Sequence, residues 1–263
     1  MNAIILAAGE GKRLRPLTED KPKCMIDLFG KPLIQRQIET FQACGINDIS
    51  IVTGYCEDKI TFDNVRYFRN YKYATTNMVE TLFCAKNAIK DSTLVSYGDI
   101  VFEKNVLKKL IEATDDMCVV VDKDWYKYWK IRFTNPLDDA ESLVLDNDGY
   151  ITNIGQKVTN TKQIMGQYIG LMKFQKNGVH ILKDFYERTK KHASSGINPL
   201  NSNLPFEKSY LTDLLQGLIL DGRKIKSVLI NNGWLEVDTI HDYEVYNHLK
   251  EEMKLHEFFM LDK

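Results

Sequence analysis

The chain has 263 residues, 27% of them charged, and a formal net charge of −1 at pH 7. This length is typical of one large α/β domain. The balanced charge gives no overall field that would attract nucleic acid or an anionic membrane, so we expect neither as a partner.

Composition also bears on the compartment. The five cysteines form no CxxC pair and no cluster with histidine, which is typical of reduced thiols in a cytoplasm. No apolar stretch approaches the roughly 20 residues that a membrane helix needs. The apolar run AIILAA has no basic leader before it, so we expect a strand there and not a targeting peptide.

The first half of the chain alternates apolar runs with amphipathic segments. Strands are predicted at 2–8, 48–55, 65–70, 93–102 and 117–125, the fourth of them ending on a Gly-Asp pair. Helices are predicted at 31–45, 75–89 and 106–113. This rhythm favours a mostly parallel sheet with helices on both faces.

The second half is more elaborate. Residues 142–156 surround Asn147-Asp148-Gly149, a hairpin signal, and strand-like runs follow at 167–174 and 224–238. Helices are predicted near 177–192, 207–221 and 244–259, and a Ser-, Asn- and Pro-rich loop at 190–209. With no repeat and no clear linker, we predict one domain over 1–263.

A glycine-rich basic loop, AAGEGKRLRP, follows the first strand. A Walker-type loop needs Ser or Thr after Gly-Lys, but Arg13 stands there, and the position five before Gly11 is Leu6. A dinucleotide fingerprint needs a small residue three positions after Gly11, but Leu14 stands there. The loop therefore fits neither of these phosphate-binding motifs.

Three segments that contain glycine or charged residues follow predicted strands: 8–23, 98–99 and 236–238. Ligands of open α/β sheets gather beyond the carboxyl ends of strands, so we expect these segments to meet. Small residues in the first let a ligand approach the backbone, and its cations, Lys12, Arg13, Arg15 and Lys23, favour anionic oxygens. Asp99 and Asp238 suit a divalent cation that bridges phosphates.

The stretch LAAGEGKRLRPLTEDKPKCMIDLFGKPLI resembles the signature of the sugar-phosphate nucleotidyltransferase superfamily. The matching positions are Gly9, Gly11, Arg13, Leu14, Pro16, Thr18, Pro22, Lys23, Gly30, Lys31, Pro32 and Leu33. The resemblance implies a Rossmann-like, GT-A-like α/β fold with a mostly parallel mixed sheet. It also implies that a nucleoside triphosphate and a phosphorylated molecule give an activated diphosphate and pyrophosphate.

The segment NYKYATTNMVETLFCAKNAI is more similar to the small cytidylyltransferases that act on phosphocholine, 2-aminoethylphosphonate or phosphoglutamine. The block VVDKDWYKYWKIRFTNPLDDAESL, with QYIGLMKF and GWLEVD, is most similar to the phosphoglutamine enzymes of capsular phosphoramidate synthesis. The resemblance thus implies CTP, Mg²⁺ and a phosphorylated small-molecule acceptor, a nucleotide-binding half over about 1–122 and an acceptor-binding half over about 123–263. Dimers are common in the superfamily, so a homodimer stays open.

Site residues follow from this resemblance together with the strand-end argument. Lys23 and Arg13 are the predicted catalytic residues, and Asp99 and Asp238 the predicted Mg²⁺ ligands. The predicted nucleotide-binding residues are Leu6, Ala7, Ala8, Gly9, Gly11, Lys12, Arg13, Asn77 and Gly98. The predicted acceptor-binding residues are Lys123, Trp129, Arg132, Tyr168, Trp234 and Glu236.

Structural alternatives stay open at this point. The glycines could make a tight turn, Asp99 could cap a turn, and Asp238 could cap the helix near HDYEVY. An aromatic cluster around Trp129 could be core. Functional alternatives are a sugar-1-phosphate nucleotidyltransferase and a non-catalytic nucleotide-sensing domain of the same fold. A glycosyltransferase would normally show an Asp-x-Asp pair where Gly98-Asp99-Ile100 stands.

Overall fold

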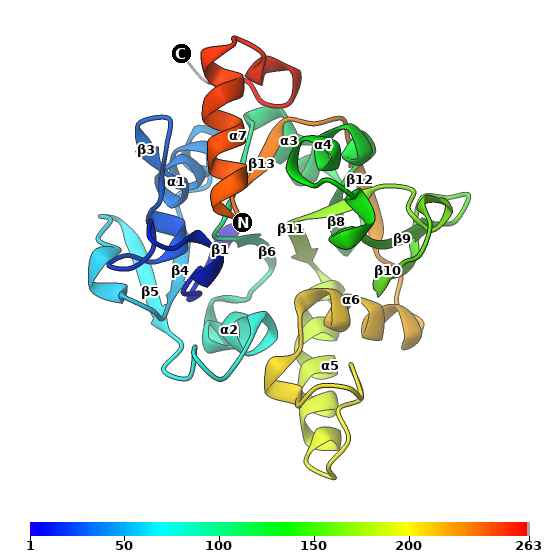
Figure 1. Ribbon diagram of the computed structural model, residues 1–263. Coiled ribbons are helices and arrows are strands. Elements are labelled where there is room, and N and C mark those ends of the chain that lie inside the picture. The colour runs from blue at the N-terminus through cyan, green and yellow to red at the C-terminus, as the bar shows by residue number, and fades with distance from the viewer. Residues whose placement is uncertain (262–263) are drawn as a thin grey trace.

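A seven-stranded sheet runs through the centre of the computed structural model, which describes residues 1–261 (Figure 1). In spatial order its strands are β12 (Lys226–Ile230), β8 (Met117–Asp122), β11 (Gln167–Gln175), β6 (Ser92–Tyr97), β1 (Asn2–Ala7), β4 (Ile49–Thr53) and β5 (Val65–Arg69). Only β11 runs antiparallel to its neighbours in this sheet. The predicted mixed, mostly parallel sheet is confirmed.

Helices cover both faces of the sheet because its inner strands are apolar on both. In β1, Ala3 and Ile5 belong to one buried cluster, and Ile4 and Leu6 to the other. The first cluster includes side chains of α1 (Leu33–Ala43) and α3 (Lys104–Glu112). The second includes side chains of α2 (Met78–Cys84), α5 (Asn177–Ala193) and α6 (Leu211–Leu220). Each fully buried Leu or Ile contributes about 1.5–3 kcal/mol relative to exposure.

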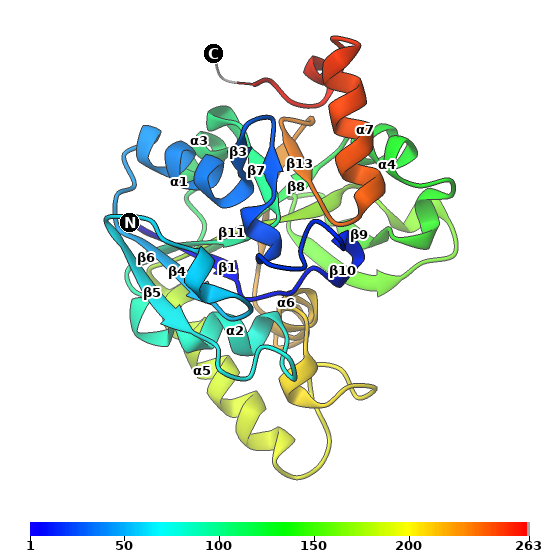
Figure 2. The same cartoon turned by 60° about the vertical axis from the view of Figure 1, so that its left-hand side comes forward.

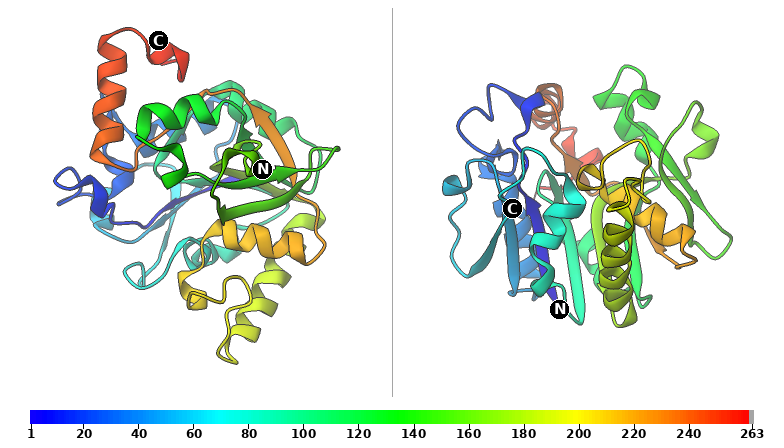
Figure 3. Two further views of the ribbon diagram at one scale, coloured as in Figure 1. Left: turned by 45° about the vertical axis from the view of Figure 1, so that its right-hand side comes forward. Right: turned by 90° about the horizontal axis from the view of Figure 1, so that it is seen from below.

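The smaller elements of the chain stand at the ends of this sheet. The predicted hairpin is confirmed as β9 (Glu141–Leu145) and β10 (Ile151–Lys157). A second antiparallel pair joins β7 (Ile100–Phe102) to β13 (Trp234–Glu236), and a third joins β2 (Asp27–Leu28) to β3 (Lys31–Pro32). The helices α4 (Trp125–Arg132) and α7 (Ile240–Glu251) lie side by side at one end, away from α5 (Figures 2 and 3).

Two predicted strands are each divided in the structure. The strand predicted at 93–102 stops at Tyr97, and β7 leaves the central sheet after the Gly98-Asp99 turn. The run 224–238 splits into β12 and β13 because Asn232 and Gly233 adopt φ values of 55° and 83°, which turn the chain. These divisions create the short strands β7 and β13, which pair with each other and lie next to the candidate active site described below.

The predicted boundaries of the last helix are wrong at both ends. Thr239 caps α7 together with Asp242, so the helix begins at Ile240 and not at 244. It ends at Glu251 because Met253 has a left-handed φ of 57°, and the amide of Lys254 bonds back to the carbonyl of Leu249 at 2.8 Å. None of the described helices is long and apolar enough to cross a membrane.

Candidate active site

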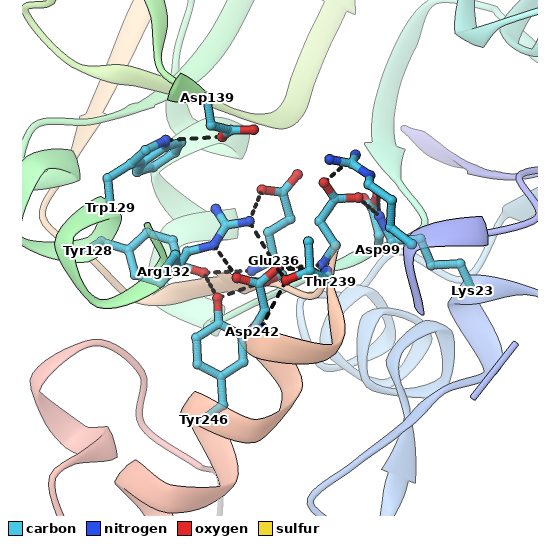
Figure 4. Close-up of polar contacts among 12 residues, drawn as sticks. Lys23, Asp99, Tyr128, Trp129, Arg132, Asp139, Glu236, Thr239, Asp242 and Tyr246 are labelled. Carbon is cyan, nitrogen blue, oxygen red and sulfur yellow. Dashed lines mark hydrogen bonds and ion pairs between the residues drawn. The ribbon is translucent and has the colours of Figure 1, made fainter. Parts of the chain in front are cut away.

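Three charged side chains meet at the carboxyl end of the sheet. Lys23 Nζ lies 2.6 Å from Asp99 Oδ2 and 2.6 Å from Asp238 Oδ1 (Figure 4). The side chains of all three are 13–14% exposed. The guanidinium of Arg13 pairs with the other oxygen of the Asp238 carboxylate, Oδ2. The three strand-end segments that the sequence singled out therefore do converge.

The small β7–β13 sheet brings the two aspartates together. Glu236 pairs with Ile100 across this sheet, and the amide of Val237 donates to the carbonyl of Asp99 at 3.0 Å. Asp99 is thereby held just before β7 and Asp238 just after β13, although 139 positions separate them in the sequence. Thr239 rather than Asp238 supplies the N-cap of α7, so the capping role considered for Asp238 is not the one observed.

The loop after β1 positions Lys23. Gly11 has a φ of 67°, and its carbonyl accepts a hydrogen bond from Thr18 Oγ1 at 2.8 Å. Leu14 is fully buried and anchors the loop to the core. A Cβ added at Gly11 would stand 2.9 Å from Lys23 Cβ. Gly11 is thus required both by the backbone and by the space that the lysine occupies.

We expect Gly11→Ala to lower kcat by at least about tenfold, because it displaces the lysine and small misplacements of a catalytic group cost rate steeply. Gly45→Ala is the matched control: Gly45 also has a left-handed φ, of 81°, but an added Cβ would meet nothing within 4 Å. Both changes should cost about 1–2 kcal/mol of unfolding free energy in denaturant titrations. Equal kcat values for the two variants would contradict the positioning role of Gly11.

A cavity of about 130 Å³ opens beside Lys23 and Asp99. Its walls include six of the predicted nucleotide-binding residues: Leu6, Ala7, Ala8, Gly9, Asn77 and Gly98. Tyr73, Thr76, Met78 and Thr81, which the sequence did not single out, line it as well. Position 98 requires glycine because the backbone of β1 lies so close that an added Cβ would stand 2.6 Å from the carbonyl oxygen of Leu6.

The remaining predicted nucleotide-binding residues lie on the loop outside the cavity walls. The side chains of Lys12 and Arg13 are 70% and 65% exposed, and Lys12 pairs with Glu10 at 3.2 Å. Exposed backbone and two cations at the mouth of a pocket can hold a polyanion whose other end enters the cavity. The geometry is therefore compatible with a base inside and phosphates at the mouth.

Electrostatics hold Lys23 in its charged form. Burial alone would lower the pKa of Lys23, but the charges of Asp99, Asp238 and Glu236 outweigh it and raise the pKa above its ordinary value. For Asp238, burial would raise the pKa, yet Lys23 and Arg13 favour the carboxylate and the pKa is lowered. Lys23 is thus a hydrogen-bond donor and a source of positive charge, and it is not a base.

Asp99 and Asp238 also fit a divalent cation. Asp99 Oδ1 is buried and has no hydrogen-bond partner within residues 1–261, so this oxygen is available to a further ligand. Over the same residues, no three His, Cys, Asp or Glu side chains are grouped so as to hold a metal by themselves. Two carboxylates, with the other ligands drawn from phosphate and water, form a donor set that suits a hard divalent cation.

The predicted acceptor-binding residues fall into two groups. Glu236 lies beside the charged cluster, Tyr168 meets Tyr97 edge-on near it, and Lys123 is exposed at the end of β8. The other three are core residues. The indole NH of Trp234 donates to Asp122 at 2.8 Å, that of Trp129 donates to Asp139 at 3.1 Å, and the Arg132 side chain is fully buried.

Several polar residues around Glu236 were missed by sequence reasoning. They are Tyr128, Asp139, Thr239, Asp242 and Tyr246 (Figure 4). The spacing of Thr239 and Asp242 is that of a capping box and was visible in the sequence. The two tyrosines carry no such signal, because aromatic residues on a helix usually indicate core.

Comparison with known proteins defines the class. The model of the MobA-like NTP transferase domain matches residues 3–192, which is more than half of the chain. The chain therefore belongs to this family and is a nucleotidyltransferase. Enzymes of this family generally use a divalent metal ion, in agreement with the two carboxylates.

Particular relatives narrow the resemblance to cytidylyltransferases. The chain is 42% identical to the CTP:phosphoglutamine cytidylyltransferase of Campylobacter jejuni over 256 residues, which cover 93% of this chain and 98% of the relative. A solved CTP:phosphocholine cytidylyltransferase from Streptococcus pneumoniae superposes with a TM-score of 0.69 at 25% identity, covering 96% and 99% of the two chains. The inositol-1-phosphate CTP transferase of T. maritima shares the fold, with a TM-score of 0.70 at 20% identity over 99% and 98%.

Proposed function

We propose that the protein condenses CTP with L-glutamine phosphate to give a CDP-linked glutamine and pyrophosphate. The observation that carries this proposal is the Lys23–Asp99–Asp238 cluster at the mouth of a pocket, in a chain that matches a phosphoglutamine cytidylyltransferase along nearly its whole length. A non-catalytic nucleotide sensor has no chemical need for these three groups together.

The acceptor brings its own nucleophile. The phosphoryl group of the acceptor has terminal oxygens like those of a phosphate monoester, whose second pKa is about 6. One of these oxygens is therefore largely ionised at neutral pH and attacks the α-phosphorus without a protein base. The P–O bond to the β-phosphate breaks, and pyrophosphate leaves with the electron pair. What the reaction requires of the protein is alignment of two anions and neutralisation of their charge.

Charged side chains of the site meet this requirement. Lys23, kept protonated by its carboxylate neighbours, donates to the α-phosphate and to the incoming phosphate. Arg13, at the mouth, contacts the β- and γ-phosphates. A unit charge pair at 4 Å interacts by roughly 4 kcal/mol at an effective dielectric of 20, so one such cation contributes much of the charge stabilisation.

Mg²⁺ is the metal we assign to Asp99 and Asp238, because two carboxylates and phosphate oxygens form a hard donor set. When bound, this ion neutralises charge on the triphosphate and fixes its geometry. The two aspartates would hold it, and Lys23 would donate to phosphate oxygens beside them. The enzyme acts in a cytoplasm that keeps its five free thiols reduced, within capsular phosphoramidate synthesis.

Phosphocholine is the second candidate acceptor, favoured by the overall structural likeness to the pneumococcal enzyme. The test is pyrophosphate release with Mg²⁺, crossing four nucleoside triphosphates with L-glutamine phosphate, phosphocholine, aminoethylphosphonate and glucose 1-phosphate. We expect turnover only with CTP, and highest kcat/KM with L-glutamine phosphate. Highest turnover with phosphocholine would correct the acceptor, and turnover with glucose 1-phosphate alone would overturn the proposal.

A further inference from the structure

A buried arginine from α4 stands behind the aspartate that we assign to the metal. The side chain of Arg132 is fully buried, with Nε 2.9 Å from Asp242 Oδ1 and Nη2 2.8 Å from Glu236 Oε2 (Figure 4). These two carboxylates belong to α7 and to the end of β13, and Asp238 lies between them in the sequence. One guanidinium therefore ties α4 to both flanks of the metal-binding turn.

Asp242 transmits this contact to Asp238. Its Oδ2 atom accepts hydrogen bonds from the amide of Asp238 at 3.0 Å and from the amide of Thr239 at 2.8 Å. Asp242 is fully buried, and a buried charge is costly unless it is paired and hydrogen-bonded. Arg132 supplies the opposite charge, so the backbone of Asp238 is oriented through Asp242 by an arginine that lies behind the turn.

Two tyrosines from the same two helices fix Glu236, two residues before Asp238. The amide of Glu236 donates to Tyr128 Oη at 2.8 Å, and Tyr246 Oη donates to the carbonyl of Glu236 at 2.8 Å. Tyr128 stands one turn before Arg132 on α4, and Tyr246 one turn after Asp242 on α7. The turn that carries Asp238 is thus held by both helices through its main chain and through its acidic neighbours.

We propose that Arg132 is a positioning residue that holds Asp238 in the geometry needed to bind the metal, a role that rests on the proposed metal function of Asp238. Its Nε and Nη2 atoms are occupied by Asp242 and Glu236, whereas Nη1 has no hydrogen-bond partner within residues 1–261, so the acceptor contact that the sequence indicated stays a prediction. Partners behind metal ligands typically change metal affinity by 10- to 100-fold when mutated. The cavity walls at 6–9 and 77 do not touch this network, so binding of CTP without metal should not depend on Arg132.

The experiment measures Mn²⁺ binding by electron paramagnetic resonance in the presence of CTP, and CTP binding by calorimetry in EDTA. The variants are Arg132→Met and Arg132→Lys. Methionine removes the positive charge, whereas lysine keeps the charge but cannot contact the two carboxylates through separate nitrogens of one planar group. Arg188→Met is the matched control, because Arg188 also bridges two carboxylates, Asp184 at 2.8 Å and Asp221 at 3.0 Å, on an exposed surface of α5. Asp238→Asn marks the loss of the metal site itself.

We expect Arg132→Met to weaken Mn²⁺ binding by about 10-fold or more, Arg132→Lys to fall between it and the wild type, and Arg188→Met to bind as the wild type does. CTP affinity in EDTA should stay unchanged in the three arginine variants. Wild-type Mn²⁺ affinity in both Arg132 variants overturns this inference while leaving the proposed function intact. If Arg132→Met does not fold, Arg132→Lys alone decides. If Asp238→Asn binds Mn²⁺ as tightly as the wild type does, the proposed metal site is overturned as well.

Discussion

Lys23→Met should lower kcat by at least about 100-fold, the loss typical of removing a preorganised transition-state donor. The lysine is held at 2.6 Å from each of two carboxylates and stays charged, so its ammonium is aligned before substrate arrives. Methionine has a side chain of similar length but supplies neither a charge nor a hydrogen-bond donor. Steady-state kinetics at saturating CTP, acceptor and Mg²⁺ give the measurement.

Lys127→Met is the matched control for this change. Lys127 lies 2.6 Å from Glu257, the same ion-pair distance, but the pair is exposed on the outside of α4. Exposed pairs of this kind contribute about 0–1 kcal/mol to stability, and we expect kcat to stay within about twofold of the wild type, since a rate factor of two is under 1 kcal/mol. Near-normal kcat in Lys23→Met would remove the lysine from the mechanism.

Asp99→Asn and Asp238→Asn should each lower kcat by about 100-fold or more at ordinary Mg²⁺, and raise the Mg²⁺ concentration needed for half-maximal rate. Asparagine keeps the shape of each side chain but withdraws one of two negative charges from a hard cation. It also withdraws one of the charges that raise the pKa of Lys23. Titrations of rate against Mg²⁺ separate the two effects, because only lost metal affinity is recovered at high Mg²⁺.

Asp184→Asn, on the exposed face of α5, controls for the loss of an acidic residue that pairs with arginine. It should leave both kcat and the Mg²⁺ requirement unchanged. If Asp99→Asn and Asp238→Asn both retained normal turnover and a normal Mg²⁺ requirement, the metal assignment would be wrong. A loss in only one of them would assign the ion to that aspartate alone.

The centre of the site was predictable from the sequence because its parts follow strands. The end of β1, the turn after β6 and the residues after β13 were each marked by a change from apolar to small or charged residues. The carboxyl ends of neighbouring strands lie at one edge of a sheet, so convergence of Lys23, Asp99 and Asp238 follows from the fold class. Their assignment to substrate and metal stays a prediction.

The support behind the site was not predictable by the same reasoning. The helix α4 has the sequence WYKYWKIR, whose aromatic residues have weak helix propensity and show no clear amphipathic period. The ion pair of Arg132 with Asp242 joins residues 110 positions apart, and no local pattern encodes it. The indoles of Trp129 and Trp234 appeared equally suited to core and ligand site, and only their burial and their bonds to Asp139 and Asp122 place them in the core.

Cytidylyl transfer itself is tested by following the phosphorus atoms during one reaction. CTP, L-glutamine phosphate and Mg²⁺ are mixed with the enzyme, and phosphorus NMR records the products with time. We predict equal amounts of pyrophosphate and of a CDP-linked glutamine, with no orthophosphate, because the bond that breaks joins the α- and β-phosphates. Formation of CDP with orthophosphate or with a phosphorylated acceptor would place the reaction at the γ-phosphate and contradict cytidylyl transfer.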